Sequence, residues 1–143
     1  MIHGIDTSLL VAAELVAHSK HEPSRAMVQQ MAQSGENMAV APQVLAEFVH
    51  AVTDSRRCKV PLTVPTALQR ADEIWNAATV VQVFPDATAV SQFFDWMRQH
   101  RLGRKRLLDT LLAATYWSAG VRSIATLNRA DFDLFRSFTI VEP

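Results

Sequence analysis

The sequence predicts an α/β protein, a three-layer α/β/α sandwich with a central, mainly parallel sheet. Short and almost wholly apolar runs recur along the chain, which is typical of strands buried on both faces. Longer segments with helical spacing of apolar residues separate these runs. Strands that alternate with helices form parallel sheets through right-handed crossovers, and these crossovers place helices on both faces of the sheet.

The elements of the first half follow from local signals. A short strand at residues 1–5 ends at Asp6, and Thr7 is the predicted N-cap of a helix at 8–17. The loop at 18–23 leads into a helix at 24–33, which stops at Ser34 and Gly35, and the apolar run 38–41 is the second strand. Pro42 then begins a helix at its first position, and this helix runs to about residue 54.

The second half continues the alternation. Residues 54–65 contain three basic residues and two prolines, which predicts a loop, and a helix at 66–78 and a third strand at 79–84 follow. Asp86 is the predicted cap of a helix that runs to about residue 100. After a helix at 107–120 that ends at Gly120, the sequence predicts a strand at 123–126, a turn at 127–130 and a last strand at 138–141.

Length and composition indicate one folded domain, residues 1–143. The chain contains no internal repeat, low-complexity stretch or long linker, and 49% of its residues are hydrophobic against 20% charged, which excludes a disordered protein. Lysine plus arginine and aspartate plus glutamate both number 14, so the net charge does not indicate a partner. Any argument about binding therefore depends on where the charges lie.

Cysteine usage and hydropathy concern the cellular compartment. The single Cys58 excludes an internal disulfide and a zinc site made of several cysteines, and it suits a reducing compartment. The N-terminus lacks the basic and apolar regions of a signal peptide, and no apolar run approaches about 18 residues, the length that spans a membrane. These features predict a soluble, cytoplasmic protein without a membrane partner.

Asp109 is the only charged residue between Leu107 and Val121, in a helix apolar enough to be predicted as buried. An unpaired buried carboxylate costs several kcal/mol or becomes protonated, so it needs backbone N–H groups, a cation or a function. One interpretation is stabilisation by the N-terminus of the helix. The other is a metal ligand at the rim of a cleft, which requires further carboxylates nearby.

Other polar residues follow predicted strands. Asp6 comes directly after the first strand, and Asn128 and Asp131 come just after the strand at 123–126. Ligands of parallel sheets bind outside the carboxyl ends of the strands, where the strand order reverses. If these two strands are neighbours, the three side chains meet in one crevice.

Four segments resemble the motifs of PIN-domain proteins. They are Asp6-Thr-Ser-Leu-Leu after the first strand, Glu47 within Pro42-Gln-Val-Leu-Ala-Glu-Phe, Asp109 within Leu108-Asp-Thr-Leu-Leu-Ala-Ala, and Thr126-Leu-Asn-Arg-Ala-Asp-Phe132. Each motif alone is weak, but their order and spacing along the whole chain are fairly specific. At this length the chain most resembles the toxins of VapBC-type toxin–antitoxin pairs. This resemblance implies a PIN-like fold and the activity of a magnesium-dependent endoribonuclease.

The same resemblance implies partners. It predicts a homodimer and a VapB-like antitoxin protein, a segment of which covers the cleft. The predicted helices offer apolar surface for such contacts, although core packing is the alternative use of the same residues. These residues are Leu9, Leu10, Ala13, Val16, Ala67, Leu68, Ile74 and Trp75.

The chemistry of the acidic residues supports the same reading. Mg²⁺ prefers oxygen ligands and keeps several waters while it uses a few carboxylates, and Mn²⁺ is its natural substitute. We predict Asp6 and Asp109 as the metal ligands. The predicted catalytic set is Asp6, Glu47, Asp109, Asn128 and Asp131, acting through metal-activated water on an RNA phosphodiester.

Each position also has a simpler interpretation. Asp6 could serve merely to start the helix that follows it, and Glu47 could be a solvated residue on the surface of its helix. Asp131 could cap a short turn, and the nearby Asp133 could take its place in the site. Many PIN domains carry aspartate where this chain has Asn128, and the amide removes one charge, so a second metal would bind more weakly. Thr7 and Thr126 are further candidates for orienting water or phosphate.

Binding of RNA requires basic residues near this acidic site. Arg101, Arg104, Lys105 and Arg106 lead into the Asp109 helix, where charge and the helix dipole favour phosphates. A weaker candidate is the loop that contains Arg56, Arg57 and Lys59. Solvated loops are the alternative for both.

Two other functions stay open. A PIN-like module could bind nucleic acid with weak or no nuclease activity, and a hydrolase of the same fold could act on DNA or on small phosphorylated substrates. The sequence contains no phosphate-binding glycine loop, dinucleotide-binding motif, nucleophile elbow or zinc-protease motif, so the chemistries that depend on those motifs find little support.

Overall fold

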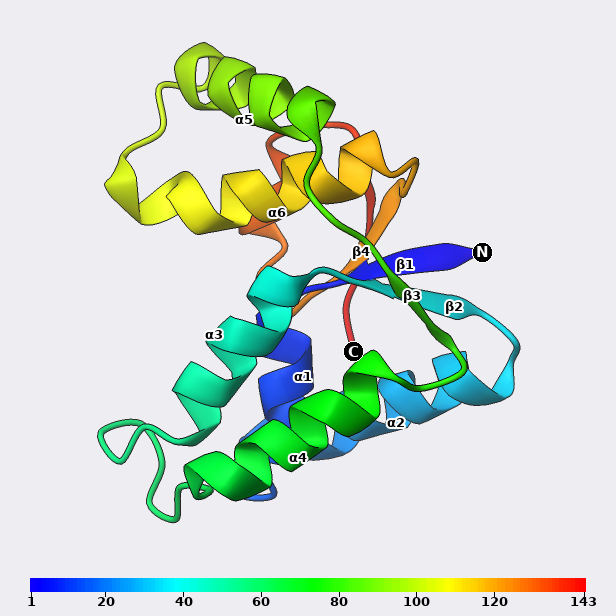
Figure 1. The fold of residues 1–143 in the computed structure, drawn as a ribbon, viewed down its shortest axis with the longest axis vertical. Coiled ribbons are helices and arrows are strands. Elements are labelled where there is room, and N and C mark those ends of the chain that lie inside the picture. Colours follow the sequence, from blue (N-terminus) through cyan, green and yellow to red (C-terminus); the bar gives the residue numbers. More distant parts are fainter.

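A computed structural model describes residues 1–143 as a parallel sheet between layers of helices (Figure 1). The strands are β1 (Ile2–Ile5), β2 (Asn37–Val40), β3 (Val80–Gln82), β4 (Ser123–Ala125) and β5 (Thr139–Val141). The helices are α1 (Thr7–Glu14), α2 (His21–Gln33), α3 (Pro42–Val52), α4 (Val64–Trp75), α5 (Ala87–Gln99), α6 (Leu107–Ser118) and α7 (Ala130–Asp133), with a short 3₁₀ turn η1 (Arg104–Arg106) before α6. None of the helices has both the length and the apolar character needed to cross a bilayer.

The sheet has five strands in the order β3-β2-β1-β4-β5, and every neighbouring pair is parallel. The predicted α/β class is confirmed, and the sheet is entirely rather than mainly parallel. The central strand β1 pairs with β2 on one side and with β4 on the other. Strands β2 and β3 therefore lie on one side of β1, and β4 and β5 lie on the other. The strand order reverses at β1, and Asp6 is the residue directly after this strand.

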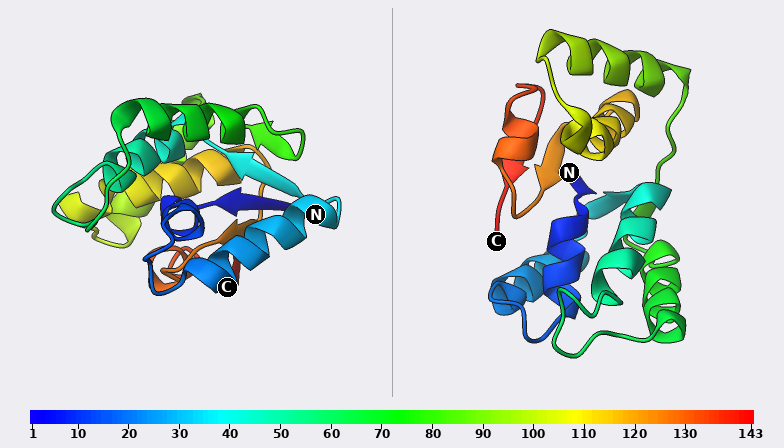
Figure 2. Two further views of the ribbon diagram at one scale, coloured as in Figure 1. Left: turned by 90° about the horizontal axis from the view of Figure 1, so that it is seen from below. Right: turned by 90° about the vertical axis from the view of Figure 1, so that its left-hand side faces the viewer.

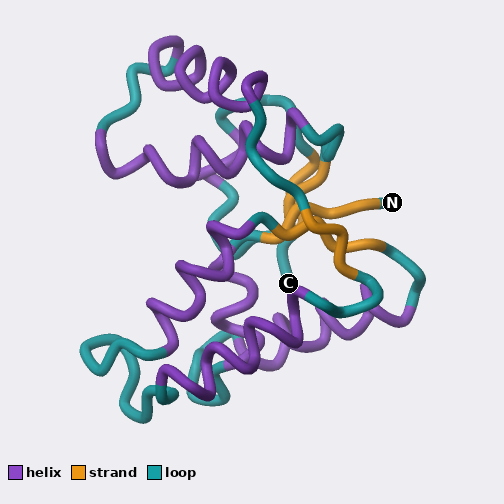
Figure 3. Tube along the Cα trace, in the orientation of Figure 1, coloured by secondary structure: helices purple, strands orange, loops and turns teal.

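The helices form two groups around the sheet. Figure 1 shows α5 and α6 above the strands and α1 to α4 below them. The views in Figure 2 show the same separation from two other sides, and Figure 3 shows the strands as a narrow central band between the helices. This is the three-layer arrangement that the sequence predicts.

The core is built from the apolar strands and the inner faces of the helices. Ile5, Val40 and Ile124 of three adjacent strands are fully or almost fully buried. Leu9, Leu10, Ala13 and Ala67, which the sequence offers as apolar helix surface, are also buried in this core, whereas Val16 and Leu68 remain exposed. Core packing therefore uses most of that surface.

Tyr116 of α6 links its helix to β1. The side chain is fully buried and its hydroxyl donates a hydrogen bond to the carbonyl oxygen of Ile5 at 2.6 Å. Its ring lies directly against Gly4, where an added Cβ would come within 2.5 Å of the ring. The missing side chain of Gly4 thus lets α6 pack closely on the end of β1, and Asp109 lies two turns earlier on α6.

Two helix starts were predicted too late. The structure begins α2 at His21 rather than at residue 24, and α4 at Val64 rather than at residue 66. Pro23 and Pro65 each lie in the first turn of these helices, where the missing N–H has no partner to lose. We interpreted both prolines as loop residues, and the correct reading is a proline near the start of a helix.

Two predictions at the site elements were also wrong in detail. Thr7 is the first residue of α1 rather than its N-cap, and α1 ends at Glu14 rather than at residue 17, because Leu15 adopts an extended conformation. The helix of Asp109 is buried only from Thr110 onward. Its first turn is open, with Leu107 and Leu108 exposed at 41% and 56%.

The Gly4 contact gives a stability prediction. Gly4→Ala should lower the free energy of unfolding by roughly 1–3 kcal/mol, because the methyl group overpacks against the Tyr116 ring. Urea denaturation measures this change. Gly103→Ala is the matched control, since an added Cβ there meets nothing within 4 Å. Equal stability of the two variants would contradict the close packing of α6 on β1.

Candidate active site

Asp6 lies at the carboxyl end of β1, beside β4. Its backbone N–H donates to the carbonyl of Ala125 at 3.0 Å, which continues the β1–β4 ladder by one residue. Its Oδ2 accepts hydrogen bonds from the hydroxyls of Ser8 at 2.6 Å and Thr126 at 2.7 Å. Asp6 occupies the N-cap position of α1 but makes no side-chain capping bond, so helix capping does not explain it.

Burial dominates the electrostatics of Asp6. The residue is only 5% exposed, and burial raises its pKa, while the hydroxyls of Ser8 and Thr126 lower it. The nearby charge of Asp131 raises the pKa further. The hydroxyls fix Oδ2 and leave Oδ1 without a side-chain hydrogen bond, so one oxygen of this carboxylate is oriented and available.

Asp109 and Asp131 share an arginine. Arg106 Nη1 lies 3.2 Å from Asp109 Oδ2 and 2.5 Å from Asp131 Oδ1, and Nη2 also donates to the backbone carbonyl of Asp131. All three side chains are partly buried, with 22%, 29% and 35% exposed for Arg106, Asp109 and Asp131. This contact joins the start of α6 to α7.

Glu47 lies on α3 and contacts the first residue of α1. Its Oε2 accepts a hydrogen bond from the Thr7 hydroxyl at 3.1 Å, and its Oε1 accepts one from Gln43 Nε2 at 3.0 Å. The same amide nitrogen donates to the carbonyl of Leu108 at 2.7 Å. Gln43 therefore connects Glu47 to the exposed first turn of α6, next to Asp109.

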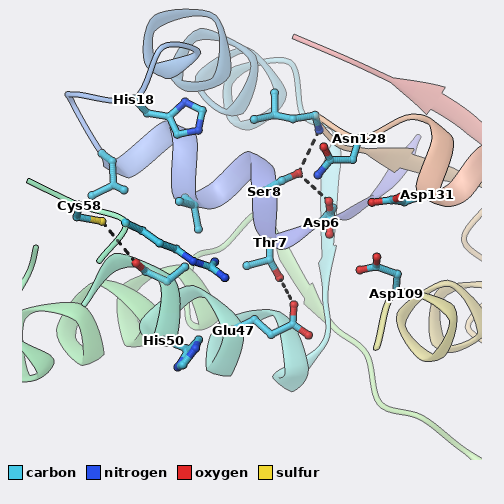
Figure 4. A pocket seen from close by; sticks show the side chains of 15 residues that line it. Asp6, Thr7, Ser8, His18, Glu47, His50, Cys58, Asp109, Asn128 and Asp131 are labelled. Atoms are coloured by element: carbon cyan, nitrogen blue, oxygen red, sulfur yellow. Dashed lines mark hydrogen bonds between the residues drawn. The ribbon is translucent and has the colours of Figure 1, made fainter. Parts of the chain in front are cut away.

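These side chains line one cleft of about 700 Å³ at the carboxyl ends of β1 and β4 (Figure 4). The predicted catalytic residues are all present in its wall: Asp6, Glu47, Asp109, Asn128 and Asp131. Figure 4 shows Asp6, Asp109 and Asp131 pointing toward a common space, with Thr7 and Glu47 on the adjoining wall. The predicted meeting of residues from the two neighbouring strand ends is therefore confirmed as a placement, while their catalytic roles stay a prediction.

The raised pKa of Asp109 reflects the crowding of negative charge in this cleft. Burial, together with the charges of Asp6 and Asp131, raises its pKa from 3.8 to about 6, against a smaller opposing effect of Arg106. Glu47 adds a weaker increase. A group of carboxylates that resist ionising together is a strong attractor for a cation.

The donor set is consistent with a magnesium ion that keeps most of its waters. No three carboxylate, histidine or cysteine side chains lie close enough to enclose a metal by themselves. Mg²⁺ commonly uses only one or two carboxylates and fills its remaining positions with water. Asp6, with one free oxygen, and Asp109, across the cleft from it, meet that requirement without a full protein cage.

The structure distinguishes among the other predicted residues. Asp131 lines the cleft, whereas its competitor Asp133 is exposed and lies outside the cleft wall. Arg101, Arg104 and Lys105 are exposed and also lie outside it, so their contact with RNA stays a prediction. Arg106, which we assigned to the same basic segment, instead forms ion pairs with Asp109 and Asp131.

Sequence reasoning missed two supporting residues. Ser8 holds Asp6 and also accepts the backbone N–H of Leu127 at 3.1 Å, so it connects the ends of β1 and β4. Gln43 lies four residues before Glu47, a spacing that places the two side chains on one helix face. This spacing was a usable signal for Gln43, whereas the link from Ser8 to Leu127 depends on strand order.

Comparison with known proteins places the fold in a recognised group. A family model described as the PIN domain matches residues 5–136. Among solved structures, Mycobacterium tuberculosis VapC20, a sarcin-ricin loop cleaving toxin, has a TM-score of 0.74 at 20% identity and covers 100% of both chains. VapBC2 from Rickettsia felis, bound to a DNA fragment from its promoter, has a TM-score of 0.70 at 17% identity over 100% of this chain and 99% of that one.

A third solved structure, VapBC-1 from nontypeable Haemophilus influenzae, gives 0.69 at 11% identity over 99% and 98% of the two chains. These identities show a shared fold. Comparison with curated proteins gives no match.

The raised pKa of Asp109 predicts a pH-dependent effect of its removal. The folded protein retains the proton to about pH 6, whereas an unfolded aspartate has its usual pKa of 3.8, so stability is lost as the pH rises between these values. Asp109→Asn has no such cost and should stabilise the metal-free protein by roughly 1–3 kcal/mol above pH 6, with the difference vanishing near pH 4.

Urea denaturation in EDTA from pH 4 to pH 8 measures the effect. The Arg106–Asp109 ion pair lost in the variant opposes it by only about 0–1 kcal/mol. Asp133→Asn removes the same charge from outside the cleft and should change stability little at any pH. An Asp109→Asn protein that is less stable than the parent at pH 8 would contradict the crowding of charge.

Proposed function

Because this chain belongs to the PIN domain family, we propose that it is a magnesium-dependent endoribonuclease and the toxin of a type II toxin–antitoxin pair. One observation carries the proposal. Four carboxylates from different elements line a single cleft. They are Glu47 of α3, Asp109 of α6, Asp131 of α7 and Asp6 at the end of β1. Such a group of carboxylates suits a hard cation and a phosphodiester better than it suits any uncharged substrate.

The residues of the chain divide the work of hydrolysis. Asp6, held by Ser8 and Thr126, presents Oδ1 toward the cleft, and Asp109 faces it from α6. A bound Mg²⁺ supplies a water activated for attack and neutralises charge on the phosphate. Glu47, fixed by Thr7 and Gln43, is placed to accept a proton or to orient a water on the adjoining wall.

Arg106 and Asn128 bear on the alternative of a binding module with weak or no nuclease activity. Arg106 already pairs with Asp109 and Asp131, so it offsets part of the charge that attracts a cation. Asn128 lines the cleft with an amide in place of a carboxylate. Both features lower the demand for a second metal, and we therefore propose one essential cation, with Mn²⁺ as a substitute for Mg²⁺.

The structural neighbours support a protein partner. Two of them are VapBC complexes, and one is bound to a DNA fragment from its promoter. We propose that this chain likewise binds a VapB-like antitoxin, which blocks the cleft until the toxin is released. The RNA target named for the Mycobacterium tuberculosis protein, the sarcin-ricin loop, is one structured substrate to include in assays.

The first test of this function is cleavage of RNA. The chain should cut a fluorogenic single-stranded RNA in Mg²⁺ or Mn²⁺, lose this activity in EDTA, and leave matched DNA intact. Asp6→Asn and Asp109→Asn should each lower turnover by about 100-fold or more, since each removes charge that acts on the transition state. Asp131→Asn should be impaired, whereas Asp133→Asn serves as the unaffected control.

Three outcomes decide among the hypotheses. Binding of RNA without cleavage in either metal supports the binding module, and cleavage of DNA or of small phosphate esters supports the other hydrolase. Wild-type turnover by Asp109→Asn refutes the assignment of the site.

The second test concerns self-association. We propose a homodimer through the exposed apolar residues of α4, because Val64 and Leu68 are 53% and 54% exposed and Leu68 borders an apolar groove with Leu45 and Trp75. Light scattering at micromolar concentration should give about twice the chain mass of 15.9 kDa. Leu68→Glu should restore the monomer mass, whereas Gln69→Glu on the next helix position should not. A monomer mass for the unaltered chain refutes the dimer.

A further inference from the structure

The cleft continues well beyond its carboxylates. The wall remote from Asp109 and Asp131 is formed by His18, which follows α1, by His50 on α3, and by Arg57 in the loop after α3. Figure 4 shows His18 and His50 on opposite walls, on the far side of Thr7 from Asp131. The cleft thus has an acidic end and an end lined by imidazole and guanidinium groups, and the proposed function so far uses only the first.

Helix α1 forms the floor that joins the two ends. Thr7 and Val11 lie on one face of it, and Leu15, the residue directly after the helix, follows at the same interval of four residues; all three line the cleft. The distance from Thr7 to Leu15 is about 12 Å at the helical rise of about 1.5 Å per residue. Nucleotides of one strand stack at about 3.4 Å, so this floor has the length of about three or four nucleotides.

Arg57 has unused binding capacity. Its guanidinium makes one long ion pair, 3.6 Å to Asp54, and its side chain is 68% exposed. A guanidinium presents five N–H donors in a fixed fork that matches a phosphate. Most of these donors remain available where Arg57 lines the cleft.

The rings of the two histidines also have nitrogen atoms without a hydrogen-bond partner. His18 Nδ1 accepts the backbone N–H of Lys20 at 3.0 Å, which leaves Nε2 of the ring without a partner. His50 is exposed and its ring makes no hydrogen bond. Between them the floor is apolar at Val11 and Leu15, which suits the face of a nucleobase better than it suits a phosphate.

We infer that this far end is a subsite for the nucleotides that flank the scissile phosphate, with Arg57 on a backbone phosphate and a base between His18 and His50 over Val11. The inference rests on the proposed ribonuclease function and assigns the path of its substrate. It also gives the RNA strand a direction through the cleft, from the carboxylates along α1 to the loop at Arg57.

The alternative path through residues 101–106 is less favourable. Arg106 is committed to Asp109 and Asp131, and Arg101, Arg104 and Lys105 lie outside the cleft wall. Arg57, by contrast, lines the cleft, and its ion-pair partner Asp54 is not one of the carboxylates in the cleft wall. The subsite therefore depends on Arg57 more than on the basic run before α6.

Binding measurements with Arg57→Gln and Arg56→Gln test the subsite. The two variants lose the same charge from adjacent positions of one exposed loop, but only Arg57 lines the cleft. Fluorescence anisotropy with a labelled single-stranded RNA is recorded in Mg²⁺, with Asp109→Asn added to the parent and to each variant so that cleavage does not interfere. Arg57→Gln should bind at least about tenfold more weakly than the parent, the scale of one lost charge-assisted hydrogen bond, and Arg56→Gln should bind as the parent does.

Salt dependence and a histidine variant sharpen the test. Arg57→Gln should reduce the slope of log affinity against log salt by about 0.7, as expected for one phosphate contact on a single strand. His50→Ala should weaken binding without changing this slope, because a stacking contact releases no counterions. Equal affinities of the Arg57 and Arg56 variants, or no binding by the parent chain, would overturn the subsite.

Cleavage in Mg²⁺ separates this inference from the proposed function. If the parent chain cleaves RNA and Arg57→Gln matches Arg56→Gln in KM, the nuclease stands and the subsite falls. If the parent chain does not cleave but Arg57→Gln alone weakens binding, the subsite stands as an RNA-binding site and the nuclease falls. If both proposals hold, Arg57→Gln raises KM and leaves kcat nearly unchanged, since its contact is equal in the ground and transition states.

Discussion

The parallel pairing of β1 with β4 is the interaction on which the cleft depends. It places Asp6 beside Ala125 and Thr126, although 119 or more residues separate these positions in the chain. A carboxylate at 5% exposure is tolerated there because Thr126 and Ser8 donate hydrogen bonds to it, and because the same strand end opens into the cleft. Tyr116 fixes α6 against β1 through Gly4 and Ile5, which holds Asp109 opposite Asp6.

This arrangement leaves the cleft short of positive charge. Arg106 compensates part of the negative charge of Asp109 and Asp131, yet the pKa of Asp109 is still raised to about 6 by burial and by its acidic neighbours. The protein therefore stores repulsion that a divalent cation would relieve, and the cation in turn makes an acidic cleft acceptable to a phosphate. The same arginine connects α6 to α7, so positioning of Asp131 and neutralisation of charge are performed by one side chain. Beyond this acidic end, the uncommitted donors of Arg57 extend the cleft toward a substrate longer than one phosphate.

Local signals at strand ends and helix starts predicted the fold class, the alternation of elements and the meeting of Asp6, Asn128 and Asp131. Asp109 stood out as a lone charge in an apolar helix, and Glu47 joined the predicted site through the resemblance to PIN-domain proteins. Pro23 and Pro65 misled the boundaries, since a proline signals a loop and a helix start equally well. The role of Arg106 could not be predicted. In the sequence it ends a basic run, and only the approach of α7 to α6 reveals that its partners are carboxylates. The cleft wall at His18, His50 and Arg57 comes from three distant segments, and no periodic pattern connects them.

Anomalous diffraction from crystals of the protein soaked in Mn²⁺ tests directly whether Asp6 and Asp109 bind a cation, because Mn²⁺ takes the same oxygen ligands as Mg²⁺ and is visible by its own scattering. We expect a peak between Asp6 and Asp109, at about 2.0–2.3 Å from a carboxylate oxygen of each, with waters in the remaining positions. The same soak of Asp6→Asn crystals should show the peak weakened or lost. A cleft without Mn²⁺ in the unaltered protein, or a peak bound elsewhere on the chain, would contradict the claim that these carboxylates form a cation site.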